Sequence, residues 1–99
     1  MKIKIEPFLM KKGIKVAKAA IEFTEVGSPL EGFHLIGFTI CDDPVKGLLV
    51  LFPANVIKEE NKETRTYFFL RPGNNTNLER LEDAIIDAYE NMMDLAKKD

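Results

Sequence analysis

The sequence has little cysteine and no long apolar run. Its single cysteine, Cys41, cannot form a disulfide within the chain, which predicts a protein of the reducing cytoplasm. No apolar stretch approaches the roughly 20 residues that a helix needs to cross a bilayer. Residues 1–6 also lack the apolar segment and the cleavage site of a signal peptide. These absences argue against a disulfide-stapled or membrane-spanning protein, and we expect a cytoplasmic one.

Residues that could carry chemistry are equally sparse. The only histidine, His34, lies in an apolar segment, and no partner residue at motif spacing accompanies it. Asp42 and Asp43 are adjacent carboxylates without further oxygen ligands, a pattern that a turn explains better than a metal site. Cys41 has no neighbouring histidine motif, and the chain has neither a phosphate-binding glycine loop nor a Cys-x-x-Cys motif. We therefore expect no enzymatic activity, no metal and no cofactor.

An excess of positive charge is missing as well. The net charge is −2, unlike the strongly basic balance of a typical nucleic-acid-binding domain. The charge is unevenly placed, because residues 1–18 contain six lysines and only one carboxylate, Glu6. Such lysines can protect an exposed edge strand from pairing, or they can form a basic patch. The sequence leaves both interpretations open.

What the chain does contain is the pattern of one small domain, residues 1–99. Its 45% apolar and 30% charged residues are typical of a soluble globular protein. Strand-like segments bounded by glycine or proline turns occur at residues 2–10, 14–24, 33–41, 47–53 and 64–71. A single helical pattern follows them. We predict an α+β fold, a small antiparallel sheet of about five strands with one long C-terminal helix packed on it.

The segment 47–53 is expected near the middle of the sheet. Its consecutive apolar residues lack the alternation of a half-exposed strand, which indicates burial on both faces. Segment 2–10, with alternating lysines and Pro7, is expected at an edge. In segment 14–24 regular alternation begins only at Ala17, which predicts a bulge near Val16 or a second buried surface there. Gly37 is expected to form a bulge or a close contact.

The clearest element is the helix after the last strand. Thr76 and Glu79 have the spacing of a capping box, which predicts that Thr76 is the N-cap. A stripe of apolar residues at three- and four-residue spacing is expected to pack on the sheet, and it consists of Leu78, Leu81, Ile85, Ala88, Met92 and Leu95. The opposite face is acidic, which argues against this helix lying on a phosphate backbone.

The strand segments after residue 33 have apolar residues on both faces. One helix covers only one face of a sheet, so these residues exceed what the single helix can bury. This excess predicts a homodimer with an isologous interface formed by the sheet.

The second half of the chain resembles a known family. The features that carry the resemblance are the strand 47–53, a polar insertion, a strand ending in Arg71 and Pro72, and a helix that contains residues 83–86 and Tyr89. In this order and spacing they resemble the stage V sporulation protein G (SpoVG) family of septation regulators. Members of that family carry a Gly-Leu-Phe-Val-x-Met-Pro strand, a His-Pro-Ile strand end and an Asp-Ala-Val-Leu-x-x-Tyr helix.

The resemblance implies a small dimeric α+β protein that binds DNA or RNA and influences septation- or sporulation-type gene expression. The cations that would contact nucleic acid are Lys58, Lys62, Arg65 and Arg71, helped by the N-terminal lysines. Asn55 and Val56 stand where the family carries basic residues. An alternative therefore stays open, a dimeric protein-interaction module of the same fold without nucleic-acid binding.

Overall fold

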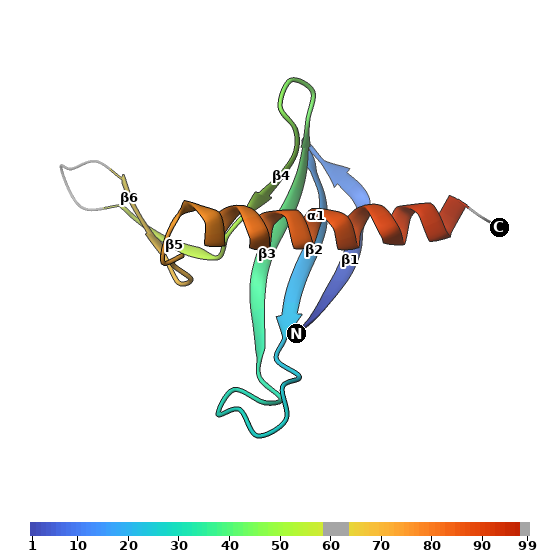
Figure 1. Cartoon of the computed structure of the whole chain (residues 1–99). Coiled ribbons are helices and arrows are strands. Elements are labelled where there is room, and N and C mark those ends of the chain that lie inside the picture. Colours follow the sequence, from blue (N-terminus) through green and yellow to red (C-terminus); the bar gives the residue numbers. More distant parts are fainter. Residues whose placement is uncertain (59–63, 98–99) are drawn as a thin grey trace.

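The computed structural model describes residues 1–58 and 64–97. It has the predicted α+β fold, in which antiparallel strands precede one long helix that packs on them (Figure 1). The described residues form six strands rather than about five. The elements are β1 (Lys2–Lys12), β2 (Lys15–Glu22), β3 (His34–Asp43), β4 (Gly47–Leu51), β5 (Ala54–Lys58), β6 (Thr64–Phe68) and α1 (Asn75–Lys97).

The strands divide into two sheets. Strands β1 to β4 form an antiparallel sheet in chain order, and β5 and β6 form a separate two-stranded hairpin. The prediction that segment 47–53 lies near the middle of the sheet is therefore wrong, because β4 is an edge strand. After Leu51 the chain leaves through Phe52 and Pro53 into β5, and none of the residues 1–58 and 64–97 pairs with the outer side of β4. The apolar pattern indicated that both faces of β4 are buried, but it could not indicate on how many sides another strand pairs with β4.

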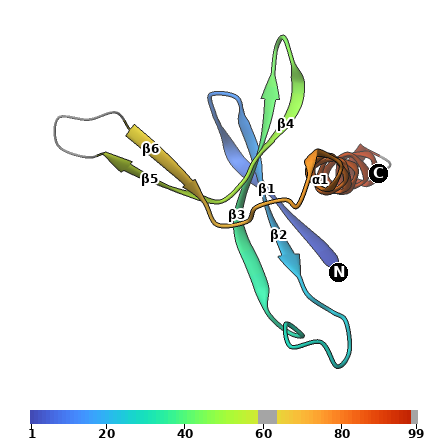
Figure 2. The same ribbon diagram turned by 60° about the vertical axis from the view of Figure 1, so that its left-hand side comes forward.

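The core lies between the four-stranded sheet and α1. Figure 2 shows α1 nearly end-on along one side of the sheet. The buried residues of this core come from β2, β3, β4 and the helix, and they are Ala17, Ala19, Ile21, Phe38, Ile40, Val50 and Ile85. The predicted alternation of β2 is confirmed. The β2 side chains at 17 and 19 are only methyl groups, and the backbone of α1 comes close to the sheet mainly at its two edge strands, β1 and β4.

Two irregularities shape the strands as the sequence predicted. The pairing of β2 with β3 shifts between Lys15 and Ala17, which confirms a bulge at Val16. Gly37 in β3 has a φ of 101°, a left-handed conformation that favours glycine. A Cβ atom at this position would lie 3.0 Å from the Cβ of Pro53. Gly37 is thus the point at which the segment leading into β5 crosses closely over β3.

The helix begins earlier than predicted. Its N-cap is Asn74, whose Oδ1 accepts a hydrogen bond from the Asn77 N–H at 2.8 Å. The prediction that Thr76 is the N-cap is wrong, since Thr76 lies inside the first turn. Asparagine satisfies a free N–H at a helix start at least as well as threonine does. The apolar stripe is confirmed at its centre, where Ile85 is fully buried, but Leu95 is 69% exposed near the helix end.

The molecule is extended for its size. Its radius of gyration is 15.4 Å, against about 13 Å for a compact domain of this length. The excess has a visible source, because the hairpin and both ends of α1 project beyond the four-stranded sheet (Figure 1). Among the described residues, no helix is both long enough and apolar enough to cross a membrane.

Candidate interaction surface

The β5–β6 hairpin stands away from the rest of the protein. It extends from the sheet in the direction opposite to α1 (Figure 2). Its ladder runs from Ala54 opposite Phe68 to Lys58 opposite Thr64. At its base the Phe69 N–H donates to the Pro53 carbonyl oxygen at 3.0 Å, which continues the pairing toward the sheet. Strand β5 was not predicted from the sequence. Its two β-branched residues lie between a polar Asn55 and a charged Lys58, a pattern that is also typical of a loop.

The predicted nucleic-acid contacts are spread along this hairpin. Lys58 pairs with Thr64, and Arg65 stands one rung nearer the base, opposite Ile57. Lys62 lies outside the described residues. Arg71 follows β6 at the base of the hairpin and is exposed. The hairpin ladder between Lys58 and the base is about 13 Å long at the usual strand rise. The structure therefore brings two of the four positions together and separates Arg71 from them.

A mainly apolar hollow lies beside β4. It occupies about 590 Å³ between β4, the base of the hairpin and the first two turns of α1. Its apolar lining residues are Val50, Leu51, Phe52, Phe68, Leu70, Pro72 and Leu78. The charged residues that line it have opposite signs, Arg71 and Glu82. This arrangement suits an apolar surface of another chain with a polar rim.

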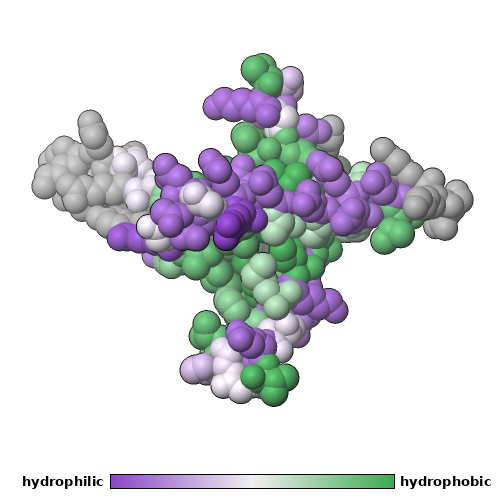
Figure 3. All heavy atoms as spheres, in the orientation of Figure 1, coloured by the Kyte–Doolittle hydropathy of each residue, from purple (hydrophilic) through white to green (hydrophobic). Residues whose placement is uncertain are grey.

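Exposed apolar side chains continue from this hollow onto the hairpin. Leu51 and Phe68 line the hollow and are 49% and 50% exposed, and Val56, farther along the hairpin opposite Thr66, is 67% exposed. Figure 3 shows the hydrophilic outer face of α1, with apolar surface on both sides of it over the sheet. Contiguous exposed apolar surface on a small protein marks a site of interaction. The signal was present in the sequence as strands with apolar residues on both faces.

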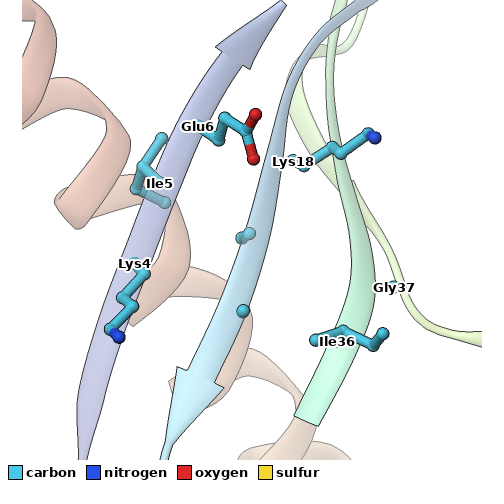
Figure 4. Close-up of a pocket in the computed structure, with 8 residues that line it drawn as sticks. Lys4, Ile5, Glu6, Lys18, Ile36 and Gly37 are labelled. Atoms are coloured by element: carbon cyan, nitrogen blue, oxygen red, sulfur yellow. The ribbon is translucent and has the colours of Figure 1, made fainter. Parts of the chain in front are cut away.

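The N-terminal lysines lie on and around the edge strand β1. Lys4 and Glu6 of β1 and Lys18 of β2 stand on the face of the sheet opposite α1 and line a shallow hollow of about 240 Å³ (Figure 4). Lys4 forms an ion pair with Glu22 at 3.0 Å, and this contact lowers the pKa of the Glu22 carboxyl. The predicted edge position of β1 is confirmed. Charges of both signs alternate here, which fits protection of an exposed edge better than a basic patch.

The three residue types considered above for chemistry, cysteine, histidine and aspartate, each have a place in the fold that needs no catalytic or metal-binding role. Cys41 is buried in β3 opposite Leu49, and His34 is exposed at the start of β3. Asp43 begins the turn into β4, where its Oδ1 accepts the N–H groups of Val45 at 2.8 Å and Lys46 at 2.9 Å. These two bonds lower the pKa of the Asp43 carboxyl, with that from Lys46 having the larger effect. Within residues 1–58 and 64–97, no cluster of three or more side chains suited to a metal occurs.

The hairpin, the apolar hollow and the open edge of β4 adjoin one another and form the candidate interaction surface. No family model, no curated protein and no solved structure matches this chain.

Proposed function

We propose that this chain is a homodimeric, SpoVG-like regulatory protein whose projecting hairpin contacts nucleic acid and so influences septation- or sporulation-type gene expression. The observation that carries the proposal is the β5–β6 hairpin, a two-stranded ribbon that stands clear of the sheet with Lys58 and Arg65 in its outer half. The major groove of B-DNA admits a two-stranded ribbon of this kind. In a homodimer the ribbon is present twice, which doubles the contact with one nucleic-acid molecule.

The proposed role is non-enzymatic and cytoplasmic. The only histidine of the chain, His34, is on the surface, whereas the only cysteine, Cys41, is buried in the sheet. A lone thiol suits the reducing environment of the cytoplasm. The proposal needs no cofactor, because phosphate contacts by Lys58, Lys62, Arg65 and Arg71 supply the binding energy.

A second candidate function is a dimeric protein-interaction module without nucleic-acid binding. The exposed apolar side chains of the hairpin, Val56 and Phe69 among them, favour this candidate. The sequence between the two strands of the hairpin also adds carboxylates, Glu59, Glu60 and Glu63, which offset its cations. A neutral, partly apolar ribbon suits a protein surface better than a phosphate backbone.

A salt titration separates the two candidates. If all four cations contact phosphates, the logarithm of the affinity for duplex DNA should fall with a slope of about −3 to −4 against the logarithm of salt concentration. The double variant Arg65→Ala and Arg71→Ala should flatten this slope by about 2 without changing sequence preference. A matched control, Lys46→Ala with Arg80→Ala, removes the same charge from exposed positions outside the hairpin and the N-terminal lysines, and it should leave the slope unchanged. Absence of binding to duplex DNA and to single-stranded RNA at about 50 mM salt would favour the interaction module.

A further inference from the structure

The two edges of the four-stranded sheet differ in how they are protected. The outer edge, β1, contains Pro7, four lysines and Glu6, which discourage another strand from pairing. The opposite edge, β4, reads Gly-Leu-Leu-Val-Leu and has neither a charge nor a proline. No described residue pairs with the outer backbone groups of β4. A sheet that protects one edge and leaves the other apolar and open is built to have the open edge covered.

We propose that the outer edge of β4 is the homodimer interface, at which β4 of one copy pairs antiparallel with β4 of a second copy. The two-fold axis passes through Leu49, so that Leu49 of one copy faces Leu49 of the other. This inference rests on the homodimer of the proposed function and specifies its interface. The result is a continuous eight-stranded sheet with both helices on the same face.

The sequence of β4 is suited to pairing with itself. About an axis at Leu49, Leu48 faces Val50 of the other copy, and Gly47 faces Leu51. Val50 shares the buried core on the α1 side of the sheet, while Leu51 is 49% exposed in the single chain. Apolar side chains therefore meet apolar side chains on both faces of the joined sheet. An interface between identical surfaces requires this self-complementarity.

The surroundings of β4 also leave room for the second copy. The hollow of about 590 Å³ lies directly beside β4, with Leu78 of α1 on its far side. In Figure 1 the first turns of α1 extend past the β4 edge of the sheet. A strand added at this edge would therefore lie under a helix that already overhangs it, and its apolar face would be buried. The opposite signs of Arg71 and Glu82 beside the hollow allow each copy to offer a charge that complements the other.

A pair of charge variants at Leu49 tests whether the two-fold axis of the dimer passes through this residue. In Leu49→Lys two lysines face each other across the interface, and in Leu49→Glu two carboxylates do so. Each variant alone is expected to raise the dissociation constant of the dimer by at least about 100-fold, because like charges are brought together at a desolvated contact. An equimolar mixture of the two variants is expected to recover the dimer. The measurement is mass by light scattering at tens of micromolar protein, with far-UV circular dichroism to verify that each variant folds.

Two further variants complete the experiment. Leu9→Lys places the same charge on the fully exposed outer edge of β1 and should leave the dimer intact. Leu51→Lys is a second variant that should disrupt the interface. Because the Leu51 side chain is already half exposed in a single copy, this variant is expected to fold, and the test remains valid even if the Leu49 variants do not fold.

Several results would overturn the inference. If Leu51→Lys and the folded Leu49 variants remain dimers, the interface lies elsewhere, although the homodimer of the proposed function stands. Folded Leu49 variants that stay monomeric when mixed would show that Leu49 does not face its own copy. A wild-type protein that is monomeric at these concentrations would overturn both the interface and the homodimer, and would leave β4 open to a strand from a different protein. The salt titration on nucleic acid is independent of all these outcomes.

Discussion

The contact between Ile85 and the sheet offers a sharp test of the fold. Ile85 is fully buried in the core with Ala17, Ala19 and Phe38. The substitution Ile85→Ala removes three carbon atoms, and at about 0.8 kcal/mol for each buried group the transfer loss is about 2.4 kcal/mol. The cavity that remains adds to this loss, so we expect a total cost of about 3–4 kcal/mol. That is a large part of the 5–15 kcal/mol by which a typical domain is stable.

Urea unfolding followed by circular dichroism measures this cost. With a denaturant slope of about 2 kcal/mol per molar, the midpoint of Ile85→Ala should fall by about 1.5–2 M. All variants are compared at one protein concentration, because the stability of a dimer depends on concentration.

Leu95→Ala is the matched control for Ile85→Ala. Leu95 belongs to the same apolar stripe of α1 but is 69% exposed near the helix end. Its replacement should change the free energy of unfolding by no more than about 0.5 kcal/mol. An unchanged midpoint for Ile85→Ala, or an equal loss for both variants, would refute the assignment of the helix face that contacts the sheet.

Other local features make predictions of their own. Asn74→Ala should lower the free energy of unfolding by about 1 kcal/mol in thermal or urea unfolding, whereas Thr76→Ala should cost less than half of that, because Asn74 is the N-cap. Gly37→Ala should cost about 1–3 kcal/mol, since its φ of 101° disfavours a side chain and the new methyl group would meet Pro53; a neutral result would contradict this packing. The pKa of Asp43 is lowered from 3.8 in the folded state, so its stabilising effect is complete above pH 3.8 and is lost as the pH falls further. The stability difference between wild type and Asp43→Ala should therefore shrink in acid, and a difference independent of pH would exclude the turn hydrogen bonds as its cause.

The parts of the fold that follow from local periodicity were predictable from the sequence. Alternation in β2 identified its buried face, and the stripe through Ile85 identified the buried face of α1. The bulge at Val16 showed itself as a change of phase in the same pattern. Each of these features depends on residues close together in the chain, so a single sequence contains the information.

The predictions that failed concern features for which the sequence allows two or more alternatives. Asn74 and Thr76 are both good N-caps two residues apart, and only the backbone geometry selects Asn74. The apolar residues of β4 required cover on both faces, which a central strand or an interface can supply equally well. The candidate cations were found as residue types, but the register that places Lys58 and Arg65 on adjacent rungs and Arg71 at the base was not visible.

The place of α1 in the chain has a consequence for synthesis. The helix that covers the sheet follows the six strands of the described residues, so the ribosome releases the apolar face of the sheet before the helix that covers it. Ile85 lies 34 residues after Leu51, and at about 5–20 residues per second the delay is about 2–7 seconds. During that interval the nascent sheet is vulnerable to aggregation, and on a crowded polysome a neighbouring nascent chain is the nearest apolar surface.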